Sequence, residues 1–213
     1  MKKIKKPESF GNILSINKDD QLLLIENFNK VIINSYYINS FQSDTKKLHK
    51  FIKHVESKFR ASEQYKNYLG FIKYEFDLTN CSILGNIDDD DASIELHHYP
   101  FTLYDITEIC LNYHFKNNIN LNSFKLIEYL LELHYQNLIG LVPLSETVHE
   151  LVHNKDSGIF IAKESIFGNV NKFVEIYKDY IPTDTLESYN KKLNNEKNDN
   201  VKILNKTNIE VIK

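Results

Sequence analysis

Two histidine pairs carry the strongest chemical signal in this sequence. His149 and His153 stand four positions apart in the stretch VPLSETVHELVHN. Residues at i and i+4 project from the same face of a helix, and this spacing allows two imidazoles to bind one metal ion. His97 and His98 are adjacent in the stretch SIELHHYP. Because side chains alternate along a strand, one of these two rings can reach a metal ion while the other faces the opposite side.

Each pair also has a simpler explanation, which the sequence leaves open. Two histidines at this spacing often occur by chance on a surface helix. On the strand, His97 could be solvated while His98 is a hydrogen-bonded residue of the core. The other histidines are scattered along the chain, and we expect them at the surface or in the core; they are His49, His54, His114 and His134.

The pattern of apolar residues predicts the elements that position these histidines. Residues 93–99 alternate as a short strand, residues 137–145 indicate a second strand that stops at Pro143, and residues 145–154 indicate a short helix. Further helices are expected at 45–59, 62–76 and 169–180, with two more inside 102–136 that begin at the caps Thr102 and Asn122. Residues 22–28 and 30–38 could each be a strand or a short helix, and the polar tail from about Tyr189 is expected to fray.

Taken together, the motifs resemble the HNH nuclease superfamily and are similar to HNH endonucleases encoded by phages. ELHHY supplies a histidine pair, NLIGLV an asparagine with leucines at +1 and +4, and VHELVH the helix. The resemblance implies that His97, His149 and His153 bind one divalent ion. It also implies that His98 is the general base that activates water and that Asn137 orients it.

This resemblance implies an α+β fold, with a ββα-metal (HNH) core, inserted helices and a mostly helical N-terminal part. The expected regions are 1–78, with possible DNA contacts, 79–160 for the core, and 161–213 for a C-terminal helix and tail. The implied activity is metal-dependent hydrolysis of DNA phosphodiester bonds. Mg²⁺, Mn²⁺, Ni²⁺ or Zn²⁺ could serve, although imidazole ligands bind Mg²⁺ least well.

Composition limits the partners. The net charge of −3 argues against a protein that coats nucleic acid through bulk attraction. DNA contacts are therefore expected locally, at Arg60 and Lys53 on the basic helix 46–60. The acidic run 88–91 is expected to be a solvated loop, with a second cation site as the alternative. No apolar run is long enough for a membrane span. The expected location is the cytoplasm, that of a bacterial host if a phage encodes the chain, and a homodimer is left open.

Two alternative functions use the same residues differently. In a zinc metalloprotease of the H-E-x-x-H type, His149 and His153 would bind zinc, Glu150 would be the base, and Glu164 or Glu175 the third ligand. Only about one helical turn precedes His149, and this hypothesis leaves His97 and His98 without a role. The third possibility is a nucleic-acid-binding module without catalytic activity.

Overall fold

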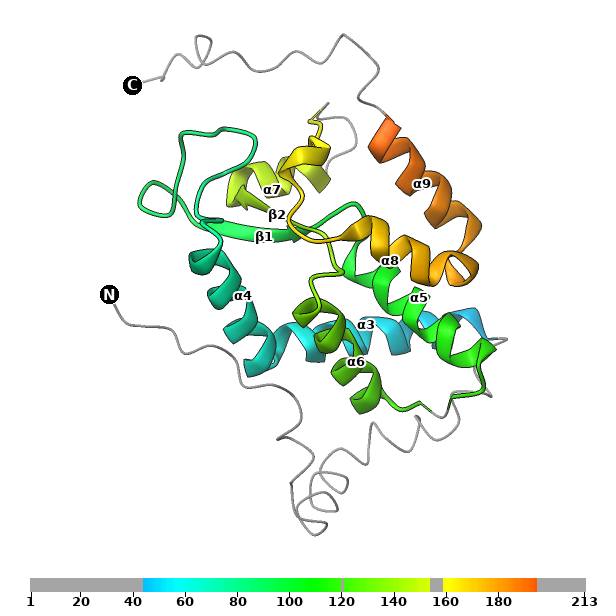
Figure 1. Ribbon diagram of the computed structural model, residues 1–213. Coiled ribbons are helices and arrows are strands. Elements are labelled where there is room, and N and C mark those ends of the chain that lie inside the picture. The colour runs from blue at the N-terminus through cyan, green and yellow to red at the C-terminus, as the bar shows by residue number, and fades with distance from the viewer. Residues whose placement is uncertain (1–43, 120, 154–158, 195–213) are drawn as a thin grey trace.

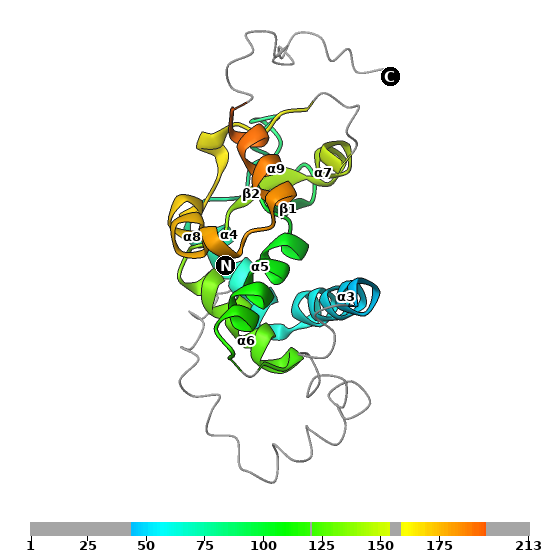
Figure 2. The same cartoon turned by 90° about the vertical axis from the view of Figure 1, so that its right-hand side faces the viewer.

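The computed structural model describes residues 44–119, 121–153 and 159–194, and these form a mostly helical α+β fold (Figure 1). A small antiparallel sheet of two strands, β1 (Ile94–His98) and β2 (Leu141–Ser145), lies beside the short helix α7 (Glu146–His153). On its other side lies a larger helical part built around α3 (Thr45–Ala61), α5 (Leu103–Lys116) and α6 (Ser123–Tyr135) (Figures 1 and 2). The α+β class expected from the sequence is therefore confirmed.

The elements follow one another in the order that the periodicity predicts, with one further helix at the end. They are α3 Thr45–Ala61, α4 Glu63–Glu75, β1 Ile94–His98, α5 Leu103–Lys116, α6 Ser123–Tyr135, β2 Leu141–Ser145, α7 Glu146–His153, α8 Val170–Tyr177 and α9 Thr183–Asn194. Short 3₁₀ turns lie at Lys163–Ser165 and Lys178–Tyr180. The expected fraying from Tyr189 is wrong as far as Asn194, because α9 continues to that residue. The segments 22–28 and 30–38 lie outside the described residues.

Side-chain caps fix the starts of the two helices between the strands. The Thr102 hydroxyl accepts a hydrogen bond from the Asp105 backbone N–H at 3.2 Å, and the Asp105 carboxylate accepts one from the Thr102 N–H at 2.8 Å. This reciprocal pair is a capping box, which satisfies two N–H groups that the helix start leaves without partners. Asn122 caps α6 by accepting from the Lys125 N–H at 2.8 Å. Both predicted N-caps are confirmed.

The helical part buries the main core, and the sheet has a smaller core of its own. Residues of α3, α4, α5, α6 and α8 share the large apolar cluster, which includes the fully buried Phe59 and Phe173. The smaller cluster lies between the sheet and α7 and includes Ile94, Val142, Leu144 and Val148. Because few apolar side chains hold α7 in place, additional interactions at this end of the molecule have a large effect on its stability.

The register of the sheet brings distant parts of the chain together. Leu96 pairs with Pro143, and His97 pairs with Val142, although α5 and α6 intervene between the strands. The expected insertion of two helices between the strands is thus confirmed. The expectation that Pro143 stops the second strand is wrong, since Pro143 is paired within β2. In a sheet of two strands both are edge strands, where a missing N–H is tolerated.

A glycine allows the close approach at the head of β2. A Cβ added to Gly140 would lie 2.0 Å from the Tyr99 carbonyl oxygen and 2.6 Å from Val170 Cγ2. The Gly140 carbonyl accepts a hydrogen bond from the Tyr99 N–H at 3.0 Å, which extends the pairing of the strands. Any larger residue would therefore push β1 and α8 away from this position.

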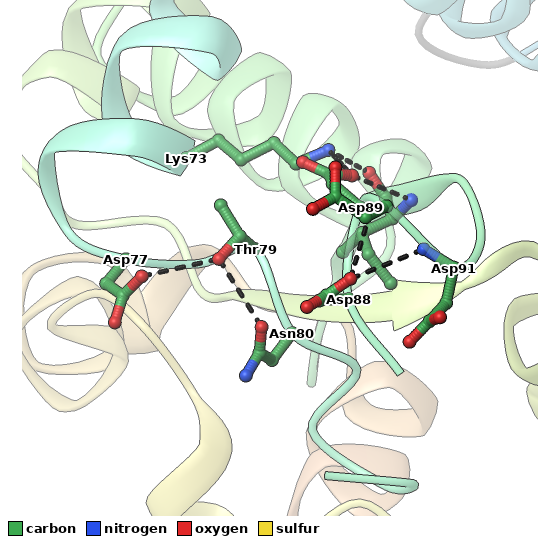
Figure 3. A network of polar contacts seen from close by, with 9 residues as sticks. Lys73, Asp77, Thr79, Asn80, Asp88, Asp89 and Asp91 are labelled. Atoms are coloured by element: carbon green, nitrogen blue, oxygen red, sulfur yellow. Dashed lines mark hydrogen bonds and ion pairs between the residues drawn. The ribbon is translucent and has the colours of Figure 1, made fainter. Parts of the chain in front are cut away.

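The acidic run forms a self-bonded loop that ties the start of β1 to α4 (Figure 3). Asp88 Oδ1 accepts from the backbone N–H groups of Asp90 at 2.9 Å and Asp91 at 3.3 Å. Lys73 Nζ lies 2.6 Å from Asp89 Oδ1 and donates to the Ile94 carbonyl at 2.7 Å. Within the described part of the chain, the loop is not among the residue groups placed to hold a metal ion.

No helix within the described ranges is both long enough and apolar enough to cross a lipid bilayer.

Candidate metal centre

Three of the predicted histidines converge between β1 and α7. His97 comes from the strand, and His149 and His153 come from the helix. Each offers one nitrogen, and the three nitrogens all lie within 4.8 Å of one another. His149 Nε2 and His153 Nε2 are 3.1 Å apart. In a tetrahedral zinc site with Zn–N bonds of about 2.05 Å, ligand nitrogens lie about 3.3 Å apart, so this pair already has the required spacing.

The local sequence explains why these three rings meet. On α7, Val148 and Val152 pack into the small core under the helix, which turns the neighbouring His149 and His153 toward the strand. On β1, alternation places Glu95 and His97 on one face and His98 on the other. Contacts of α7 with both strands hold the helix over the first of these faces.

Glu95 completes the surroundings of His149. Its Oε2 lies 2.5 Å from His149 Nδ1, so this ring donates its Nδ1 proton to the carboxylate. In the neutral ring, Nε2 then carries a lone pair, and it faces His153. A carboxylate behind a histidine ligand fixes the ring and raises its basicity at metal sites in general. Glu95 was not predicted as a site residue, although its spacing of two residues from His97 on a strand was the available signal.

The electrostatics favour neutral rings at His97 and His153. Burial, and after it the charges of His149 and His153, lower the pKa of His97 to about 3. Burial and then the charge of His149 also lower the pKa of His153. A neutral imidazole keeps the lone pair that a metal ion requires, so His97 is available as a ligand throughout the physiological pH range.

His98 points away from this centre and into the helical core. It is 4 % exposed, and its Nε2 lies 3.1 Å from His134 Nε2 and 3.5 Å from the Tyr65 hydroxyl. His134 Nδ1 donates to the Leu130 carbonyl at 2.6 Å, so the Nε2 of a neutral His134 must accept. His98 Nε2 is then the protonated nitrogen of that pair. Burial, and next the charge of His134, hold the pKa of His98 well below its usual value.

Asn137 is placed by its backbone. It follows α6 with a φ of +55°, a left-handed conformation that asparagine tolerates better than most residues. Its N–H donates to the His134 carbonyl at 2.9 Å, and its carbonyl accepts from the Asn169 N–H at 2.6 Å. Asn137 therefore joins the end of α6 to the start of α8, and among the described residues no hydrogen bond joins it to His98.

The two predicted DNA contacts lie in different surroundings. Arg60, near the end of α3, lines the same hollow of about 690 Å³ as His97, His149 and His153. Lys53 pairs with Glu56 at 2.8 Å and lies 5.0 Å from the centre of the Tyr104 ring. Arg60 thus lies on the hollow that the histidine triad lines, whereas Lys53 is not among the residues that line this hollow.

The comparisons with known proteins assign the chain to a class. A family model, described as bacteriophage G278-like virion protein, matches residues 1–213. No curated protein and no solved structure matches the chain. The class is therefore that of bacteriophage proteins. Within it, the chain belongs to the bacteriophage G278-like virion protein family.

This membership corrects the functional expectations. The assignment to the HNH superfamily and the endonuclease activity are wrong, because the whole chain matches a virion protein family. The catalytic roles expected for His98 and Asn137 are therefore wrong as well, and both residues make hydrogen bonds within the helical part of the fold. The protease hypothesis, with Glu150 as the base, is wrong for the same reason. Only the expected phage origin is supported. The resemblance was carried by a few histidines whose spacing suits a metal ion, and such geometry occurs with or without catalysis.

Proposed function

We propose that this chain is a structural component of the phage particle in which His97, His149 and His153 hold one transition-metal ion. The observation that carries this proposal is the convergence of three ligand nitrogens within 4.8 Å from a strand and a helix that are distant in sequence. The ion would link α7 to β1. The two strands and α7 would then form a small β-β-α unit with one metal ion bound between β1 and α7.

The ligand chemistry selects among the expected ions. Three neutral imidazoles suit Zn²⁺ and Ni²⁺, whereas Mg²⁺ prefers oxygen ligands in an octahedral arrangement. Zn²⁺ accepts a tetrahedral site with three histidines and one further ligand. We therefore propose Zn²⁺ as the ion, with Ni²⁺ and Mn²⁺ as weaker substitutes.

A structural role for the ion is supported by the small number of other interactions that stabilise the sheet and α7. A sheet of two strands is only marginally stable alone, and an isolated helix as short as the eight-residue α7 is not stable in water. An ion that binds only the folded state, at a free concentration about 1,000 times its Kd, stabilises that state by about 4 kcal/mol. This is a large fraction of the stability of an ordinary domain.

The remaining expectations stay predictions. The comparisons with known proteins do not test DNA as a partner, a homodimer, or the region boundaries after residues 78 and 160. We also propose that the chain is made in the cytoplasm of the bacterial host, where it would be incorporated into particles.

The experiment uses the full chain, stripped of metal by a chelator and then supplied with ZnCl₂. We expect one zinc per chain by elemental analysis and a rise in Tm of about 10 °C, from about 4 kcal/mol at 2–4 °C per kcal/mol. His153→Ala should abolish both effects. His49→Ala is the matched control, because His49 is also an exposed histidine and bonds only the Tyr104 hydroxyl among the described residues.

The proposed metal site would be refuted if the chain retains no zinc, or if the His153→Ala variant binds zinc as well as the parent protein. The structural role is tested separately by mass spectrometry of purified phage particles. If the protein is missing from particles but abundant in lysates, it is not a structural component.

A further inference from the structure

The hollow beside the triad offers the ion an open position. His97, His149 and His153 all line this hollow of about 690 Å³. Three histidines leave a tetrahedral ion with one position to fill, and this position faces the hollow because all three rings do. The volume is far larger than the roughly 30 Å³ that one water molecule occupies. The space can therefore admit a ligand group larger than water.

Arg60 supplies a second recognition element on the same hollow. Among the described residues, no carboxylate forms a salt bridge with its guanidinium. Its position near the end of α3 places it on the wall of the hollow that His97, His149 and His153 also line. A guanidinium presents its N–H groups as a planar fork that matches the two oxygens of a carboxylate or phosphate.

The other charges around the hollow are already paired. Lys73 is neutralised by Asp89 at 2.6 Å, and Glu95 is bonded to His149 at 2.5 Å. Without a metal ion, the positive charges of Arg60 and Lys73 are balanced by the negative charges of Glu95 and Asp89. A divalent ion held by neutral imidazoles adds two positive charges. The hollow therefore becomes attractive to an anion only when the metal is bound.

We infer that the metal-loaded hollow binds a single oxyanion group, with one oxygen on the ion and the group paired with Arg60. This inference rests on the proposed metal site. The group is the carboxylate of a neighbouring protein chain or a free phosphate, which share the same oxygen chemistry. A polyanion fits less well, because the exposed Asp90 and Asp91 lie in the loop that leads into β1 and repel an extended row of phosphates.

The test uses the full chain loaded with Co²⁺, whose visible absorption reports changes in its ligands. Acetate, inorganic phosphate and a short DNA duplex are added in separate titrations. We expect acetate and phosphate to shift the absorption. Arg60→Gln should weaken both by about tenfold, which corresponds to about 1.4 kcal/mol. Lys58→Gln is the matched control, since Lys58 lies on the same helix but lines a different hollow.

The outcomes separate this inference from the proposal beneath it. A response to acetate or phosphate that depends on Arg60 supports the oxyanion site, and the stronger response identifies the source of the group. Co²⁺ absorption that no anion changes, or that changes equally in both variants, overturns the inference and leaves the metal site intact. Tighter binding of the duplex than of phosphate, at equal phosphate concentration, overturns the restriction to a single group. If Co²⁺ gives no absorption at all, the metal site itself is wrong.

Discussion

Replacing Glu95 by glutamine tests whether the surroundings of the triad are built for a metal ion. Glu95 bonds His149 Nδ1, which is not the nitrogen of this ring that would bind the ion. The amide oxygen of glutamine can still accept the same hydrogen bond, so the substitution removes the negative charge and little else. If the triad is a metal site, Glu95→Gln should weaken binding without abolishing it.

The size of the effect follows from the exposure of the pair. Loss of a carboxylate behind a histidine ligand typically costs 10–100-fold in metal affinity, or about 1.4–2.8 kcal/mol. The side chains of Glu95 and His149 are 46 % and 28 % exposed, so water screens their interaction. We therefore expect the lower end of the range, about tenfold. His149→Ala, which removes a ligand, should cost at least about 1,000-fold, on the scale of zinc binding energies of 10 kcal/mol and more.

The assay is a competition for Zn²⁺ between the protein and a chromophoric chelator of known affinity. Glu150→Gln serves as the matched control, because Glu150 is an exposed glutamate on α7 next to His149 in sequence. It should leave the affinity unchanged. Unaltered binding in Glu95→Gln would refute the supporting role of this carboxylate. Equal losses in Glu95→Gln and Glu150→Gln would show that only the general negative charge of the region matters.

Three further predictions concern the fold around the centre. Gly140→Ala should lower the free energy of unfolding by about 2–4 kcal/mol in urea titrations, because the new Cβ would lie 2.0 Å from a backbone oxygen. Gly85→Ala is the control: Gly85 has open space around it and a φ of +67°, so this change should cost only about 1–2 kcal/mol. Equal losses in the two variants would contradict this reasoning. Burial lowers the pKa of His134 to about 4, so the unfolded chain binds a proton near pH 6.5 that the folded chain binds only near pH 4. His134 alone should therefore cost the metal-free protein on the order of 3 kcal/mol as the pH falls from 7 to 4, and His97 and His98, whose pKa values are also lowered, add to this loss. A flat urea midpoint across that range would count against neutral buried rings. His98→Ala should lower the free energy of unfolding by about 2–4 kcal/mol but leave the zinc affinity, measured by the same competition assay, within about threefold of that of the parent protein. A large loss of zinc affinity would show that His98 belongs to the metal centre.

The local elements were predictable because each has a signal in its own residues. Apolar spacing marked the helices, and Thr102 and Asn122 are caps whose side chains bond the N–H groups expected of them. Pro143 was misjudged because a proline stops a central strand but is tolerated at an edge. Whether a strand is central depends on how many strands the sheet has, and that is a tertiary property.

The site was predictable in part. The i, i+4 pair on α7 and the alternation on β1 indicated that His149, His153 and one of the two strand histidines could meet, and the choice of His97 came from the resemblance to HNH nucleases. Which face of β1 met α7 depended on the packing of Val148 and Val152, which no short motif encodes. The function was misjudged because histidines at this spacing suit metal binding with or without catalysis. Hydrolysis also requires a base, and the expected base, His98, is turned toward His134.

The connection between the strands has a consequence for the order of folding. Glu95 and His149 stand 54 positions apart, and α5 and α6 fill the chain between them. Local helices form faster than pairings between such distant segments, whose loop must first be closed. The nitrogens that would bind zinc therefore come together only after the helical hairpin has folded back. Capture of the ion would be a late kinetic event, and zinc uptake in a refolding experiment would mark the moment when the tertiary structure is complete.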